Sequence, residues 1–145
     1  MKLLDLLIKH EGLELKPYTD TTGHLTIGVG RNLTSNGISK EEAQFMLSND
    51  INDVCRELSI KIPWAMSLDE VRFAVIQDLC FNLGIDKLLT FQKFLEFLKE
   101  SDYISAANDL LNTLWAKQVG IRAKEDAKMM ETGLWPDDPS FNLVC

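Results

Sequence analysis

Apolar residues recur at helical spacing in the first ten positions of the chain, where four of them share one face: Leu3, Leu4, Leu7 and Ile8. Gly12 follows directly, and glycine is a typical residue at the end of a helix. The pattern therefore predicts a short N-terminal helix whose last turn contains Glu11. The carbonyl end of a helix carries partial negative charge, so it is an unfavourable place for a carboxylate and suggests a functional reason for one.

Between residues 13 and 26, β-prone residues flank a segment rich in turn formers, Thr-Asp-Thr-Thr-Gly at 19–23. This predicts a β-hairpin with Asp20 in its turn, followed by a third short strand at 31–36. Gly28 and Gly30 allow close backbone approach. The segment lacks the Lys-Ser/Thr of a phosphate-binding loop, which disfavours a nucleotide site.

The rest of the chain has helical patterns. Capping-box sequences at 39–42 and 67–70 predict the starts of two helices, the first running to about Ser59 and the second to Gly84. The second is apolar nearly all round, which is typical of a buried central helix. Further helices are predicted at 90–99, 102–111, 114–117 and 122–131. The tail, 137–145, has little periodicity, and we expect it to be poorly ordered.

Composition narrows the class of protein. A chain of 145 residues that is 46% hydrophobic and 26% charged fits one globular domain. Cys55, Cys80 and Cys145 have no metal-binding or disulfide-framework spacing, so we expect reduced thiols, no metal and no cofactor. A net charge of −7 argues against nucleic-acid binding. The N-terminal segment predicts neither a signal peptide nor a membrane anchor.

Glu11 and Asp20 are the candidate chemical pair, nine positions apart on two different predicted elements. Two carboxyl groups that face a gap can cleave a glycosidic bond: the protonated one gives its proton to the leaving oxygen, and the ionised one activates water or attacks carbon. The ordinary alternative is a solvated helix-end charge and a common turn residue. These two residues alone favour that alternative.

Segments 11–13, 16–20 and 26–30 closely resemble the phage-type lysozymes, the endolysin muramidases of tailed bacteriophages. That family has a Glu, an Asp nine residues on and a Thr six further, which Glu11, Asp20 and Thr26 match. The resemblance continues through 68–72, 81–84, 114–124 and 132–135, and so covers about residues 1–136.

The resemblance implies a fold. It predicts an α+β chain with a two-lobed lysozyme-like fold, in which the active-site cleft lies between a small β-sheet lobe and a larger helical lobe. Residues 1–145 would form a single lysozyme domain, with a small lobe and connecting helix at 13–60 and a helical lobe from 1–12 and 61–136. The first helix would pack on the helical lobe, and 137–145 would be the tail.

The resemblance also implies catalytic roles. Glu11 would be the general acid, Asp20 the carboxylate that activates water, and Thr26 a hydroxyl that positions that water. Family members invert the anomeric configuration. Arg122 matches the arginine that pairs with and orients the catalytic Glu, and the alternative is a solvated charge on the last helix.

Four further positions match residues around the family's cleft. Phe81 and Asn82 align with its helical wall, and Gln118 with the segment beneath it. Asn82 is expected either to hydrogen-bond near Glu11 or to cap its own backbone. Trp115 is expected in the core rather than against sugar.

The implied function is hydrolysis of the β-1,4 bond between N-acetylmuramic acid and N-acetylglucosamine in bacterial peptidoglycan, for host cell lysis. The resemblance predicts a monomer that stays in the host cytoplasm until a holin gives it access to the cell wall. Two alternatives remain open, a transglycosylase and a non-catalytic wall-binding protein. Arg31 and Asn32 depart from some relatives, which affects the expected substrate contacts. His10 and His24 receive no chemical role.

Overall fold

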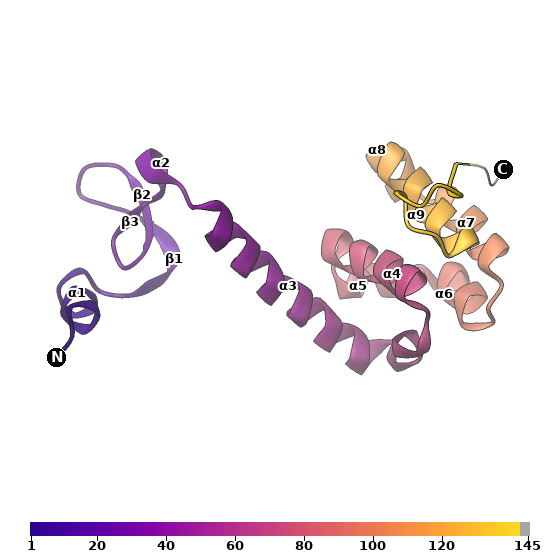
Figure 1. Ribbon diagram of the computed structural model, residues 1–145, viewed down its shortest axis with the longest axis horizontal. Helices are drawn as coiled ribbons and strands as arrows, with labels where there is room; N and C mark the ends of the chain where they lie inside the picture. Colours follow the sequence, from indigo (N-terminus) through magenta and orange to yellow (C-terminus); the bar gives the residue numbers. More distant parts are fainter. Residues whose placement is uncertain (143–145) are drawn as a thin grey trace. The chain divides into compact units, whose positions relative to one another are not determined.

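The computed structural model describes residues 1–142, which fold as two compact units (Figure 1). Unit 1 is residues 1–47, and unit 2 begins at Ser48; the helix α3 (Lys40–Lys61) begins in the first and ends in the second. The described chain is mostly helical and has one small antiparallel sheet. This confirms the predicted α+β, lysozyme-like fold class. The expected lobe boundaries, with the first helix on the helical side, stay a prediction.

Unit 1 contains the predicted helix and hairpin. The helix α1 (Leu3–Glu11) ends at Glu11, where Gly12 has φ 80° and donates its N–H to the Ile8 carbonyl at 2.8 Å. The strands β1 (Glu14–Thr19), β2 (Leu25–Gly28) and β3 (Arg31–Asn32) form an antiparallel sheet in the order β1-β2-β3. The hairpin closes through the Asp20 N–H, which donates to the His24 carbonyl at 2.9 Å.

The prediction of a strand over 31–36 is wrong beyond Asn32. The side-chain oxygen of Asn32 accepts from the Ser35 N–H at 2.9 Å and caps the single helical turn α2 (Leu33–Asn36). An asparagine that caps a helix in this way diverts the backbone from the sheet. The Ser39 capping box is confirmed: the Glu42 N–H donates to Ser39 Oγ at 3.1 Å, and the Ser39 N–H donates to Glu42 Oε2 at 2.8 Å.

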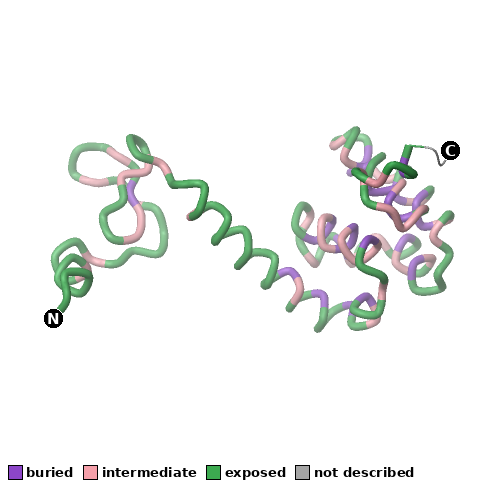
Figure 2. Tube along the Cα trace, viewed as in Figure 1, coloured by how far each residue is buried: buried purple, intermediate pink, exposed green. Residues whose placement is uncertain are grey.

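Unit 2 is a helical bundle. It contains the 3₁₀ turn η1 (Pro63–Ser67) and six helices in its described part: α4 (Glu70–Leu83), α5 (Ile85–Leu89), α6 (Gln92–Lys99), α7 (Tyr103–Leu111), α8 (Leu114–Val119) and α9 (Ile121–Thr132). Its core includes fully buried side chains from several elements: Leu58, Ile76, Leu79, Phe94, Leu110 and Met130 (Figure 2). The predicted buried character of α4 is confirmed, since five of its residues are buried.

The structure of unit 2 differs from the prediction in two places, at the start of α4 and at the short helix α5. The helix α4 starts from Asp69, whose carboxylate accepts from the Arg72 N–H at 3.0 Å, because Ser67 is taken up by the turn that follows Pro63. The short helix α5 was not predicted, because its five residues are too few to show a clear period.

Arg72 ties α4 to the end of α9. Its Nε donates to the Met130 carbonyl at 2.7 Å and its Nη2 to the Glu131 carbonyl at 2.9 Å, while its guanidinium lies 3.6 Å from the centre of the Tyr103 ring. A cation at a helix C-terminus satisfies carbonyls that have no partner within the helix. Arg72 therefore holds α9, which carries Arg122, against α4.

The beginning of the tail is packed. Phe141 is only 7% exposed, and Lys128 Nζ lies 4.8 Å from the centre of its ring. The prediction of a poorly ordered tail is thus wrong for 137–142, because Phe141 contributes to the core of unit 2; residues 143–145 lie outside the described part. Cys55 and Cys80 are free thiols as predicted, and Cys145 lies outside the described residues. No helix in 1–142 has the length and apolarity needed to cross a membrane.

Candidate active site

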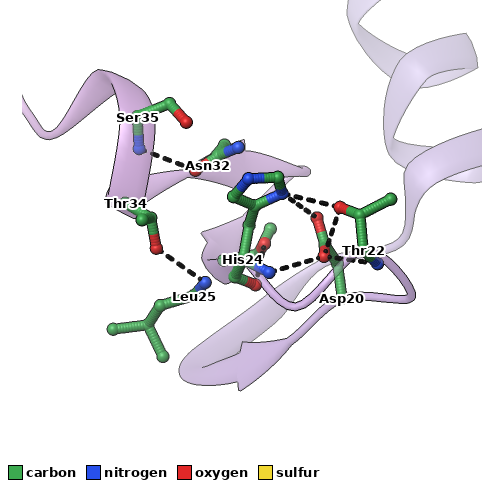
Figure 3. Close-up of polar contacts among 8 residues, drawn as sticks. Asp20, Thr22, His24, Leu25, Asn32, Thr34 and Ser35 are labelled. Atoms are coloured by element: carbon green, nitrogen blue, oxygen red, sulfur yellow. Dashed lines mark hydrogen bonds and ion pairs between the residues drawn. The ribbon is translucent and has the colours of Figure 1, made fainter.

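The hairpin turn of unit 1 fixes the carboxylate of Asp20 (Figure 3). Its Oδ1 accepts three hydrogen bonds, from the Thr22 N–H at 2.9 Å, the Thr22 hydroxyl at 2.8 Å and the His24 N–H at 2.8 Å. An aspartate in a turn commonly binds the backbone that follows it. The hydrogen bonds from the His24 backbone and the Thr22 side chain lower the pKa of Asp20. Asp20 is therefore ionised at neutral pH.

The other carboxylate oxygen of Asp20 is much less engaged. Oδ2 lies 3.8 Å from Nδ1 of His24, which is beyond hydrogen-bond distance. No hydrogen bond to Oδ2 is formed by any other residue in 1–142. The turn thus uses one oxygen for anchoring and leaves the second able to accept a proton or a water hydrogen bond.

Thr26 is buried on β2, with only 4% of its surface exposed. It pairs with Tyr18 on one side and Asn32 on the other. Its hydroxyl donates to the His24 carbonyl at 3.1 Å, which uses its one hydrogen. The Thr26 oxygen is then left as an acceptor, the role needed to hold a water molecule by one of its hydrogens.

Glu11 lies at the C-terminal end of α1, close to the glycine backbone that follows β2. A Cβ placed on Gly30 would lie 3.2 Å from Glu11 Oε2, and Gly30 has φ 67°. An apolar hollow borders the Glu11 side chain and is lined by α1 and the β2–β3 turn: Leu3, Leu4, Leu7, Ile8 and Val29. The surroundings of Glu11 are therefore very different from the polar turn around Asp20.

The other predicted site residues belong to unit 2. Phe81 is 48% exposed in the last turn of α4, and Gln118 is exposed on α8. Asn82 accepts from the indole Nε1 of Trp115 at 2.7 Å, and Trp115 is only 3% exposed. Trp115 is thus a core residue, as expected. The Asn82 oxygen holds this indole, a contact that the sequence did not indicate.

Arg122 forms a two-point ion pair with Asp78 of α4. Its Nε donates to Oδ2 at 2.9 Å and its Nη2 to Oδ1 at 2.6 Å. Arg122 is therefore not a free solvated charge. Burial alone would raise the pKa of Asp78, but hydrogen bonds from Arg122 and Asp126 outweigh it and lower that pKa. The expected pairing of Arg122 with Glu11 stays a prediction.

Asp126 of α9 completes this cluster, and sequence reasoning missed it. It is 6% exposed, and its Oδ2 is buried without a hydrogen-bond partner in the described chain. Burial, followed by its hydrogen bond to the charged Asp78, raises the pKa of Asp126 to about 8. The signal available in the sequence was a lone carboxylate between Ala123, Ala127 and Met130 on the apolar face of a helix.

The described residues contain no group of three His, Cys, Asp or Glu side chains placed to hold a metal ion. The functional groups around the hairpin turn are the Asp20 carboxylate, the Thr22 and Thr26 hydroxyls and the His24 imidazole.

A small antiparallel sheet, a helical bundle and carboxyl groups on α1 and the hairpin are the architecture of a lysozyme-like glycoside hydrolase. The phage lysozyme family model matches residues 8–129, and the chain belongs to this family. It is 32% identical to an endolysin of Acyrthosiphon pisum secondary endosymbiont phage 1, over 83% of each chain. It is 27% identical to a probable T4-type lysozyme 2 of Dictyostelium discoideum, over 90% of this chain and 94% of that protein.

A third relative shares only part of its length with this chain. The pre-baseplate central spike protein Gp5 of Enterobacteria phage T4 is 26% identical over 92% of this chain, which corresponds to 28% of the spike protein. Family and relatives together make the chain a lysozyme-type glycoside hydrolase that acts on peptidoglycan.

Proposed function

We propose that the chain hydrolyses the β-1,4 bond between N-acetylmuramic acid and N-acetylglucosamine with inversion, through Glu11, Asp20 and Thr26. The observation that carries the proposal is the hydrogen bonding of Asp20. Its Oδ1 is anchored by three donors, its pKa is lowered, and its Oδ2 is left as an acceptor. A carboxylate held in this way suits a general base that receives a proton from water.

In the proposed reaction, Glu11 donates its proton to the glycosidic oxygen as that bond breaks. A water molecule held by Asp20 Oδ2 and Thr26 Oγ1 loses a proton to Asp20 and attacks the anomeric carbon from the opposite face. Inverting enzymes separate their two carboxyl groups by roughly 6.5 to 9.5 Å, which leaves room for that water. The hydrogen bond from Thr26 to the His24 carbonyl orients the Thr26 oxygen as an acceptor for it.

The residues of unit 2 extend the proposal. Phe81, Asn82 and Gln118 would contact the glycan strand, and Arg122 would orient Glu11, as the family resemblance implies. The exposed ring of Phe81 suits a sugar face, and the anchoring of Asn82 by Trp115 fixes its amide. These roles stay predictions.

The similarity to an endolysin supports a role in host cell lysis. We propose that the chain acts as a monomer in the lysis of a bacterial host. It would remain in the host cytoplasm until a holin gives it access to the cell wall.

The test compares peptidoglycan hydrolysis by the wild type, Glu11→Gln and Asp20→Asn, with Glu14→Gln as the matched control. Glu14 is exposed on β1 and lies outside the proposed machinery. Loss of a general acid or base typically lowers the rate by about 10²- to 10⁴-fold. We expect that loss in the first two variants and wild-type rates in Glu14→Gln. Full activity in Glu11→Gln or Asp20→Asn would remove that residue from the mechanism.

The products test the bond and the stereochemistry. Mass spectrometry should find reducing N-acetylmuramic acid ends, and NMR of the fresh product should find the α-anomer first. Anhydro sugar ends would instead assign a transglycosylase, which needs no water-activating Asp20. Retention of the β-anomer would contradict inversion.

A further inference from the structure

A chain of hydrogen bonds links Asp20 to His24 through the hydroxyl of Thr22 (Figure 3). Thr22 Oγ1 lies 2.8 Å from Asp20 Oδ1 and 2.6 Å from His24 Nδ1. A hydroxyl has one hydrogen, and an ionised carboxylate has none to give, so the Thr22 hydrogen points at Asp20. The second contact then requires that His24 Nδ1 carries the hydrogen and donates it to Thr22.

This count of hydrogens determines which nitrogen of the His24 imidazole is the donor. The His24 ring has a hydrogen on Nδ1, and this N–H donates to the Thr22 hydroxyl. His24 Nδ1 also lies 3.8 Å from Asp20 Oδ2, the oxygen proposed to receive the proton from water. The positive charge of His24 contributes to lowering the pKa of Asp20. His24 thus lies against both carboxylate oxygens of Asp20, one reached through the Thr22 hydroxyl and the other 3.8 Å from its ring.

We propose that His24 is a positioning residue for Asp20: its Nδ1–H donates to the Thr22 hydroxyl and holds that hydroxyl so that Asp20 Oδ2 faces the water. The inference rests on the proposed function, because it assigns His24 a role only if Asp20 activates water. It gives a chemical role to a histidine for which the sequence indicated none.

The other charges around this turn are engaged elsewhere or lie outside salt-bridge distance. Arg31 of β3 is paired with Glu42 at 2.8 Å. The turn α2 carries no ionisable side chain, and its Thr34 hydroxyl accepts from the Leu25 N–H at 2.9 Å. The ionisable residues of β1, Glu14, Lys16 and Tyr18, form no ion pair with His24 in the described chain, and Asp20 is the carboxylate that does.

The experiment uses variants of the full chain that keep or remove the His24 donor and the hydroxyl that it holds. In His24→Asn, the amide N–H stands where Nδ1 stood but does not titrate. His24→Phe removes the donor, and Thr22→Val removes the hydroxyl that links the two residues. Thr21→Val is the matched control, because Thr21 is exposed in the same turn and its hydroxyl forms no hydrogen bond within residues 1–142.

We expect His24→Phe and Thr22→Val to lower kcat on peptidoglycan by about fivefold with little change in KM, which is the scale of one hydrogen bond. His24→Asn and Thr21→Val should keep the wild-type kcat at pH 8. Thermal denaturation of each variant shows whether it is folded.

Unchanged kcat in both His24→Phe and Thr22→Val would overturn the inference, and so would a kcat in His24→Asn as low as in His24→Phe, because the Asn amide keeps the donor. An effect confined to KM would also overturn it, since it would mean that His24 only binds substrate. The proposed function fails by a different result, namely full activity in Asp20→Asn. If His24→Phe does not fold, Thr22→Val and His24→Asn still decide the question.

Discussion

The two units of this lysozyme hold their candidate functional side chains by different means. In unit 1, Thr26 is the one buried residue, and the site is shaped by hydrogen bonds within a turn. In unit 2, side chains from α3 to α9 form a continuous apolar core. The first arrangement fixes a few polar atoms with little packing, and the second supplies most of the stabilising burial. Catalytic geometry and stability are therefore expected to respond to different substitutions.

Two aspartates make this difference concrete. Asp20 in unit 1 is surrounded by hydrogen-bond donors, and its pKa is lowered. Asp126 in unit 2 is buried beside a charged carboxylate, and its pKa is raised to about 8. Donors favour the charged form of a carboxyl group, whereas burial favours the neutral form. The same residue type is thus kept ionised in one unit and neutral within the fold of the other.

The largest effect on stability should come from the core of unit 2. Phe94→Ala removes a fully buried ring and should lower the free energy of unfolding by about 3 to 5 kcal/mol. The matched change in unit 1 is Leu15→Ala on β1, where the side chain is 81% exposed, and it should stay within about 0.5 kcal/mol. Denaturant unfolding measures both. Equal losses would contradict the contrast between the two units.

Asp126→Asn should stabilise unit 2 in a pH-dependent way. Because its pKa is higher in the folded chain than the ordinary 3.8, wild-type stability should fall as the pH rises from about 4 to about 8. A single such group contributes at most about 1.4 kcal/mol per pH unit in that window, whereas the lowered pKa of Asp78 changes stability only at pH values below about 4. We expect a gain of about 1 to 3 kcal/mol at pH 8 and little change at pH 4.

The control for that prediction is Glu131→Gln, which removes one negative charge from an exposed position of the same helix. It should leave the pH dependence of unfolding as it is in the wild type. If Asp126→Asn is no more stable than the wild type at pH 8, that result would contradict a raised pKa of Asp126 in the folded chain.

The sequence predicted the elements that have a clear local pattern. The apolar spacing before Gly12, the turn formers at 19–23 and the Ser39 capping box each determine a local structure, and the structure has all three. It missed the cap at Asn32 and the turn at Ser67, because in both cases two local hydrogen-bonding choices compete and the surroundings decide.

For the site, the sequence predicted which residues to consider but not what they contact. The pairing of Arg122 with Asp78 joins positions 44 residues apart, and the bond between Asn82 and Trp115 joins positions 33 apart. Such contacts depend on how α4, α8 and α9 pack, which no local pattern encodes. His24 was given no role for a related reason, since the argument depends on the direction of one hydroxyl hydrogen.

Two glycines of unit 1, Gly28 and Gly30, separate the effect of backbone strain from the effect of a contact with Glu11. Gly28 and Gly30 have φ 70° and 67°, so alanine strains both positions by about 1 kcal/mol. A Cβ at Gly28 meets nothing within 4 Å, whereas one at Gly30 lies 3.2 Å from Glu11 Oε2. Both variants should lose similar stability. Only Gly30→Ala should also lower kcat, by about tenfold, because it displaces the proposed acid. Equal kcat in the two would show that a methyl group at Gly30 does not displace the Glu11 carboxyl group.

The smallest effect should come from the ion pair of Arg31 with Glu42, which links β3 to the start of α3. Hydrogen bonds from Arg31 and from the Ser39 backbone lower the pKa of Glu42 to about 2. Since that pKa is depressed in the folded chain, the pair stabilises above the ordinary value of 4.5, and its contribution is lost as the pH falls toward 2. Glu42→Gln should lower the melting temperature slightly at pH 7 and leave it unchanged near pH 2. Salt should shrink the difference in melting temperature, because both side chains are more than 40% exposed.

The control is Glu41→Gln, which changes a carboxylate one position earlier and outside the ion pair. It should have no such pH-dependent effect. A difference between Glu42→Gln and the wild type that persists at pH 2 would mean that packing, and not charge, joins β3 to α3.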